Sequence, residues 1–253
     1  MRKFITSTVI ALSLLSFKSD NSLLLRLNEG QTIKYSNQLL TNGYSDEALT
    51  SGIFRGELLF NQSVTVTKST NEGYEADIKL LRMKFKQENP RWSIDYDSDR
   101  KDAISEGRGG MMAMFMSSLL QETYKFELTK TGKVTKRPKI QTPDGNDFAA
   151  GFSNIFIELP GRPVRIGDSW MNEITFRNSK FQIMYTVAGV VNGLLELDTE
   201  VVGDETSPPG KTYLDPASGL LVKSEFETIS KQYNQMTGTD AFVKTKVVIQ
   251  LLP

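Results

Sequence analysis

The sequence predicts a mainly β protein, built on an antiparallel curved sheet or half-open barrel with one or two short helices packed on it. Apolar and polar residues alternate with a period of two along most of the chain, which is typical of half-buried strands. Short turn sequences separate these alternating segments, and connections this short favour antiparallel neighbours. Two segments break the alternation and have helical spacing instead.

The first half of the chain begins with a strand over residues 31–41, which places Ile33, Tyr35 and Leu39 on one face. The apolar set of a later strand changes parity just after Leu80. Because a one-residue slip exchanges the two faces of a strand, a β-bulge is expected near Leu80. The other strands of this half are expected at residues 54–66, 74–85, 92–96 and 124–128.

The second half contains the strongest turn signal, Asn192-Gly193 between two apolar runs. Both residues tolerate the positive φ of a type I′ turn, so a two-residue hairpin is expected there. A second turn is expected at 215–219. The strands of this half are expected at residues 181–187, on both sides of Asn192-Gly193, and at 211–214, 220–231 and 242–252.

Two helices are predicted, one over residues 111–121 and one over 146–159, where three phenylalanines are spaced four residues apart. The second helix and the Pro-rich segment that follows it join two possible halves, 23–145 and 160–253. Each half has a Gly-containing turn before its first strand, Glu29-Gly30-Gln31 or Ile166-Gly167-Asp168. This similarity suggests duplication of one β unit.

Residues 1–19 are predicted to be a secretory signal peptide. Arg2 and Lys3 form a basic start, and the apolar stretch Phe4 to Leu15 has the length of a signal core. It is shorter than the roughly 20 residues that a membrane helix needs. The protein is therefore expected to be exported, periplasmic or extracellular, without a membrane span.

The composition restricts the function. The chain has no histidine and no cysteine, which excludes Ser-His-Asp and Cys-His relays, histidine metal sites and disulfides. No other catalytic motif is present, so we expect no enzyme activity and no cofactor. Without Arg2, Lys3 and Lys18, 27 basic residues remain of 30, against 30 acidic ones, which argues against a nucleic-acid partner.

Three segments together resemble an uncharacterised family of exported β-rich proteins of gram-negative bacteria. They are Leu27 to Tyr35, Leu159 to Trp170, and Tyr213 to Leu220. The third also resembles a turn in periplasmic half-barrel lipid carriers of the lipoprotein-localisation type. The family resemblance implies no activity and no catalytic residue. This chain lacks the lipidated cysteine of many relatives of those carriers.

Methionines are concentrated in the first predicted helix, which is apolar nearly all round and is therefore expected to be buried on most sides. Methionine fills irregular gaps and also lines adaptable binding surfaces. The helix is therefore either a core plug under the sheet or the wall of a ligand site. The candidate ligand-binding residues are Met111, Met112, Met114, Phe115, Met116 and Leu119.

A calcium-like pattern occurs at Asp95, Asp97, Asp99 and Glu106, positions one, three, five and twelve of an EF-hand loop. Position six should be glycine, but Arg100 stands there. We therefore expect no metal site, and interpret Asp95 and Asp97 as the solvent face of a strand end.

The leading hypothesis is a non-catalytic envelope protein that binds a hydrophobic ligand, such as a lipid, or the surface of an envelope protein. The alternative is a structural or adhesion-type β module with a filled core and no ligand. An apolar cavity in the structure would favour the first hypothesis, and a packed interior would favour the second.

Overall fold

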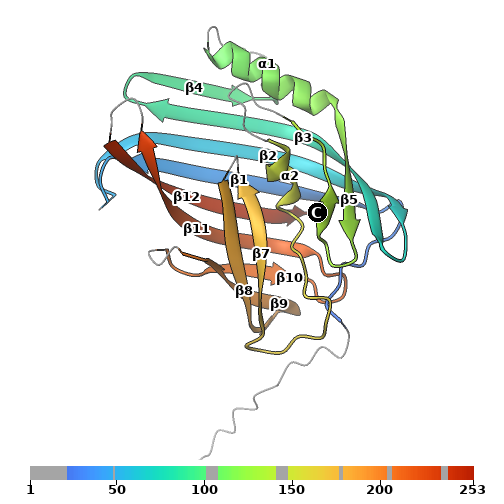
Figure 1. The fold of residues 1–253 in the computed structure, drawn as a ribbon. Helices are drawn as coiled ribbons and strands as arrows, with labels where there is room; N and C mark the ends of the chain where they lie inside the picture. Colours follow the sequence, from blue (N-terminus) through green and yellow to red (C-terminus); the bar gives the residue numbers. More distant parts are fainter. Residues whose placement is uncertain are drawn as a thin grey trace, which may run out of the picture.

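The computed structural model describes residues 22–47, 49–100, 108–140, 148–176, 179–203, 207–234 and 239–253. Within these residues, twelve strands form one antiparallel, open and curved sheet, which confirms the predicted fold class (Figure 1). The strands are β1 (Thr32–Tyr44), β2 (Gly52–Ser69), β3 (Gly73–Asn89), β4 (Trp92–Asp97), β5 (Thr123–Thr129), β6 (Val134–Lys136), β7 (Ser169–Phe176), β8 (Ser179–Val191), β9 (Leu194–Val201), β10 (Gly210–Leu214), β11 (Leu221–Asn234) and β12 (Thr239–Leu252).

The strand order is β6-β5-β3-β2-β1-β12-β11-β10-β9-β8-β7, and β4 pairs with β3. The sheet therefore consists of two wings, β1–β6 and β7–β12, which meet in the middle where β1 pairs with β12. The outermost strands of this order, β6 and β7, are edges of the described sheet, and β4 forms a further edge beside β3. Edge strand β6 carries Lys136, which pairs with Glu127 on β5, and a charged edge discourages pairing with another chain.

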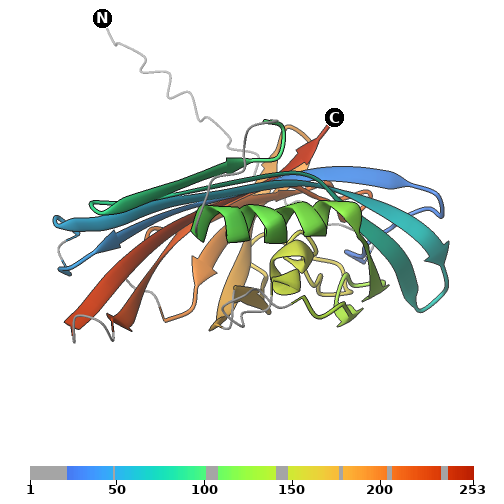
Figure 2. The same cartoon turned by 90° about the horizontal axis from the view of Figure 1, so that it is seen from above.

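Two helices, α1 (Arg108–Gln121) and α2 (Ala149–Ser153), lie on the concave side of the sheet (Figure 2). The second is much shorter than predicted. After Ser153 the buried residues are Ile155, Ile157 and Leu159, so the period changes from four to two and this segment is not helical. No described helix has both the length and the apolarity needed to cross a membrane.

Two local predictions are confirmed. The register of β2 and β3 shifts so that Asn61 pairs with Arg82 and Gln62 with Leu80, which leaves Leu81 as the extra residue of a bulge. Its side chain is exposed, whereas Leu80 and Met83 are both buried. The hairpin between β8 and β9 turns at Asn192 and Gly193, whose φ angles are 53° and 82°, in agreement with a type I′ turn.

The segments that carry the family resemblance meet at one end of the sheet. Arg26, next to the first segment, donates its backbone N–H to the carbonyl of Ser218 in the third, at 2.7 Å. A Cβ on Gly219 would collide with the backbone of Leu24 and the side chain of Leu159, so only glycine fits this junction. The residues just before the first segment therefore contact the third segment, which also meets the second at Leu159.

The two wings begin with the same hydrogen-bond pattern. Gly30, before β1, donates to the carbonyl of Val66 at 2.8 Å, and Gly167, before β7, donates to the carbonyl of Val187 at 2.8 Å. In both cases the valine N–H donates back to the residue after the glycine, at 2.9 Å. Both glycines have positive φ. The duplication itself stays a prediction.

Candidate functional site: a cavity on the concave face

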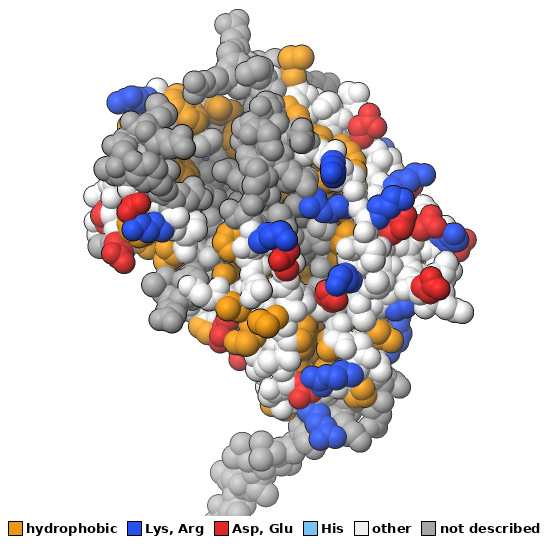
Figure 3. All heavy atoms as spheres, viewed as in Figure 1, with side chains coloured by type: hydrophobic (Ala, Val, Ile, Leu, Met, Phe, Trp, Pro, Cys, Tyr) orange, Lys and Arg blue, Asp and Glu red, His pale blue; other side chains and the backbone are white. Residues whose placement is uncertain are grey.

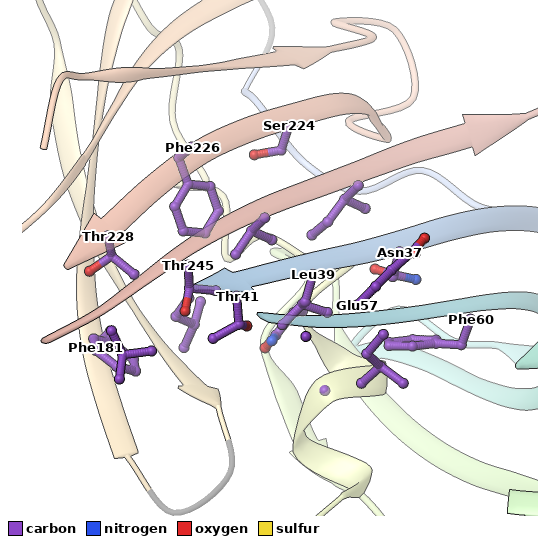
Figure 4. Close-up of a pocket in the computed structure, with 18 of the residues that line it drawn as sticks. Asn37, Leu39, Thr41, Glu57, Phe60, Phe181, Ser224, Phe226, Thr228 and Thr245 are labelled. Carbon is purple, nitrogen blue, oxygen red and sulfur yellow. The ribbon is translucent and has the colours of Figure 1, made fainter. Parts of the chain in front are cut away.

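The concave face of the sheet is filled at one end and hollow at the other. At the closed end, Tyr35, Val64, Ile78 and Phe126 are almost completely buried. Further along β1, β2 and β3, a cavity of about 440 Å³ lies between the sheet and the elements that cover it (Figure 4). This volume falls within the range of small-molecule binding sites.

The centre of the cavity floor is an apolar row that crosses five strands. The register pairs Leu58 with Phe85, Leu39 with Leu58, Leu39 with Val247, and Val247 with Phe226. All five side chains line the cavity. Because inward positions recur every second residue, the next row along the strands, away from the closed end, is also inward-facing.

That next row is polar. It contains Thr41 on β1, Thr245 on β12 and Thr228 on β11, with Gly56 and Gln87 on the far side. Figure 4 shows the three threonines on adjacent strands beside the cavity. The cavity therefore combines a band of hydroxyl groups with a larger apolar surface.

The roof comes from the helices and from β7 and β8. Met116 of α1, Phe148 just before α2, and Gly151 of α2 line it on one side. Phe148 and Phe152 pack edge to face with their ring centres 5.3 Å apart, and Phe115 of α1 packs on Phe148 at 5.9 Å. The two helices are thus held together by aromatic contacts. On the other side, the roof residues are Ile174, Phe181, Ile183 and Tyr185.

The described lining of the cavity contains one charged side chain, and that side chain is paired. Glu57 lines the cavity, but its carboxylate accepts hydrogen bonds from Gln38 (3.2 Å) and Lys84 (3.0 Å). The residues next to these two in the sequence, Leu39 and Phe85, face inward, so Gln38 and Lys84 are at outward positions of their strands. Burial raises the pKa of Tyr185 above its usual value, so this group stays protonated. Elsewhere, Lys and Arg side chains lie beside Asp and Glu on the molecular surface (Figure 3).

Asn37 lies in the row on the other side of the apolar band, between Phe60 of β2 and Ile249 of β12. The residue is 2% exposed, and its Nδ2 atom has no hydrogen-bond acceptor among the described residues. A buried amide without a partner is costly. Asn37 is therefore a second polar feature of the cavity wall, separate from the threonine row.

The candidate residues of the methionine helix have different environments. Met116 and Leu119 are buried, and Met116 lines the cavity. Phe115 is partly buried, while Met114 is 71% exposed. The side chains of Met111 and Met112 lie outside the described residues. The expectation that this helix is buried on most sides is met only in part: α1 packs on β3 and β4 and Phe115 packs on Phe148, but Met114 lies in solvent.

We expect Met116→Ala to lower the free energy of unfolding by about 2–3 kcal/mol, since it removes a buried side chain. Met114→Ala should change it by less than about 0.5 kcal/mol, as is usual for exposed positions. Urea unfolding of both variants checks this. Equal losses would contradict the placement of the two side chains.

The aspartates of the calcium-like cluster form ion pairs with two arginines. Arg82 donates to both carboxylate oxygens of Asp97, at 3.2 and 2.7 Å, and its Nε lies 3.0 Å from a carboxylate oxygen of Asp99. Arg100 pairs with Asp95 at 2.9 Å. Glu106 lies outside the described residues. Asp97 is buried rather than on a solvent face, which corrects the strand-end interpretation for this residue. The absence of a calcium site stays a prediction.

The hydrogen bonds from Arg82 hold the pKa of Asp97 below its usual value. A lowered carboxyl pKa stabilises the fold above the unfolded-state value of about 3.9, and this stability is lost as pH falls through the folded-state pKa. We expect Asp97→Asn to cost about 1–2 kcal/mol at pH 7 and little at pH 2. Urea unfolding at both pH values checks this, with the exposed Asp95→Asn as the control. An equal cost at both pH values would contradict it.

The residues of the cavity floor were not among the candidates from sequence. A signal was present: Asn37 and Thr41 occupy inward positions of a strand whose other inward residues are Ile33, Tyr35, Leu39 and Gly43. Polar residues on the buried face of a strand need a partner. Their meeting with β11 and β12 depends on long-range pairing, which the sequence alone does not reveal.

No protein-family model matches the sequence, and no curated protein matches it. The resemblance to an exported family therefore stays a prediction. Among solved structures, a match is found to lipovitellin, in a structure describing lipid–protein interactions in that protein. The TM-score is 0.53 with 12% identity, and the match covers 89% of this chain and 25% of the lipovitellin chain. The two share a fold.

This chain thus spans about a quarter of the lipovitellin chain it matches. A second structure, DynF from the dynemicin biosynthesis pathway of Micromonospora chersina, matches with a TM-score of 0.26 and 9% identity. That match covers 99% of this chain and 92% of DynF. We draw nothing from a likeness with so low a score.

Proposed function

We propose that this protein binds a hydrophobic or amphipathic small molecule of the lipid class in the cavity, and does not alter it chemically. The observation that carries the proposal is the cavity itself, about 440 Å³ between the curved sheet and its roof. Its floor is crossed by the apolar row from Phe85 to Phe226, which would solvate a hydrocarbon chain. Each methylene buried there contributes about 0.8 kcal/mol to binding.

The fold likeness to lipovitellin is in keeping with this proposal, because lipid–protein interactions are described in that protein. The alternative of a structural module requires a filled core. The hollow end of the sheet argues against it, although the opposite end is packed.

Binding without catalysis is supported by the chemistry of the lining. The chain has no histidine, and the carboxylate of Glu57 is bound by Lys84. The raised pKa of Tyr185 keeps its phenol protonated near neutral pH, so no phenolate is available to act as a base. The described lining thus offers hydrogen bonds and apolar contacts.

Native mass spectrometry of the full chain, purified from its own cells, tests the proposed function. We expect a population heavier than the polypeptide by the mass of a lipid, and loss of that excess after organic extraction. The extracted protein should then take up the neutral dye N-phenyl-1-naphthylamine with increased fluorescence. A protein that carries no extra mass and takes up no dye would refute the proposal.

Export is a second, separate proposal, and it rests on the basic and apolar start of the chain within residues 1–19. N-terminal sequencing of protein from cells should find a mature start between about residues 17 and 23. Protein that retains Met1 would refute export and leave the cavity proposal intact.

A further inference from the structure

We propose that the ligand is an amphipathic lipid whose polar group is uncharged, such as an ester or a hydroxyl, and that Thr41, Thr228 and Thr245 hold this group. The inference rests on the proposed function and names the ligand chemistry of the same cavity. Three observations carry it: the geometry of the threonine row, its open hydrogen-bonding capacity, and the lack of an unpaired charge in the described lining.

The three threonines stand side by side on adjacent strands. Thr41 is directly opposite Thr245, and Thr245 is directly opposite Thr228. Directly opposed residues have Cβ atoms about 4.5–5.5 Å apart, so the row crosses the floor in two such steps. A hydroxyl both donates and accepts a hydrogen bond. The row can therefore bind an ester, which only accepts, or a hydroxyl, which does both.

These hydroxyls have no partner within the described part of the chain. A neighbouring set behaves differently: Thr199, Thr212 and Ser224 bond to one another across β9, β10 and β11, each at 2.8 Å. That set is buried and satisfied internally. The threonine row instead faces the cavity with its hydrogen bonds unmade, as expected of a surface that meets a polar group of a ligand.

A charged group would have no counter-charge at this depth. Among the described lining residues the one carboxylate belongs to Glu57 and is held by Lys84 at 3.0 Å. Moving an ionised carboxylate or phosphate out of water without a partner is strongly unfavourable. An ester or hydroxyl loses much less on transfer and regains it from the threonines.

The rows also orient the ligand. Leu39, Val247 and Phe226 lie one inward step from the threonines on the same three strands, about 7 Å along each strand. A lipid with its polar group at the threonine row would place its chain on this apolar row. The chain would then point toward Asn37 and the closed end.

Displacement of N-phenyl-1-naphthylamine from the full chain by three twelve-carbon probes tests the inference: methyl laurate, laurate at pH 8, and dodecane. We expect methyl laurate to displace the dye at least about ten-fold more effectively than laurate, because only the ester enters without burying a charge.

In the triple variant T41V/T228V/T245V, methyl laurate should bind about five- to ten-fold more weakly, since one net hydrogen bond corresponds to about a five-fold change in Kd. Dodecane should bind this variant as well as it binds the unmodified protein.

Thr65→Val is the matched control. Its hydroxyl lies on the exposed side of β2, bonded to Thr32 at 3.0 Å, so all three probes should behave as with the unmodified protein. Circular dichroism would verify that each variant is folded, and single Thr→Val variants replace the triple variant if it is not. Laurate binding as tightly as its ester, or a triple variant with unchanged affinity for methyl laurate, would overturn the inference while leaving the proposed function standing. Failure of every probe and of the dye would refute both.

Discussion

Replacement of Phe152 by alanine is expected to lower the free energy of unfolding by about 3–5 kcal/mol. The ring is completely buried and lies 5.6 Å from the ring of Phe60 on β2, 5.6 Å from Tyr124 on β5 and 5.3 Å from Phe148. One side chain therefore attaches α2 to the sheet, and it contacts Phe148, which in turn packs on Phe115 of α1. Its loss removes both the buried apolar surface and the aromatic contacts.

Urea unfolding followed by circular dichroism measures this effect. Phe156→Ala is the control, because Phe156 follows the same four-residue spacing but is partly exposed, so a smaller loss is expected. Phe152→Leu keeps most of the volume and should give an intermediate loss, which is useful if the alanine variant fails to fold. Equal losses for Phe152→Ala and Phe156→Ala would show that α2 is not anchored by Phe152.

Local sequence signals were sufficient for most of the fold. The alternation that predicts strands reflects burial on one face, and it identified even the bulge after Leu80. The second helix was predicted too long, because the spacing of Phe148, Phe152 and Phe156 outweighed the alternation of Ile155 and Ile157 that overlaps it. Two periodicities compete in this segment, and tertiary packing decides between them.

The site was harder to predict, since the cavity depends on which strands become neighbours. Thr41 and Thr245 are 204 positions apart in the sequence and directly opposite in the sheet. No local pattern connects them, because pairing of β1 with β12 follows from the arrangement of the whole chain. The methionine helix was conspicuous from composition, yet Met116 is the one described methionine of that helix that lines the cavity.

The largest expected effect on binding comes from filling the cavity at Gly56. This glycine lies on the floor in the threonine row, between Thr41 and Gln87. An added Cβ would come no closer than 3.8 Å to any atom beyond its neighbours in the chain, the nearest being Thr41 Cβ. There is thus room for a side chain, and it would project into the cavity.

We expect Gly56→Phe to weaken dye and lipid binding at least about 100-fold. An aromatic ring here displaces about four methylenes of a bound chain, and at about 0.8 kcal/mol each the loss is about 3 kcal/mol, or more than two orders of magnitude in Kd. Stability should be unchanged or higher by up to about 1 kcal/mol, because glycine inside a strand is unfavourable and phenylalanine favours strands.

Gly52→Phe is the control. Gly52 lies on the same strand and is exposed, with no atom within 4 Å of an added Cβ, so this variant should bind dye and lipid as the unmodified protein does. Fluorescence titration and urea unfolding separate the two quantities. A Gly56→Phe variant that is folded and binds dye and lipid normally would place the ligand outside the cavity.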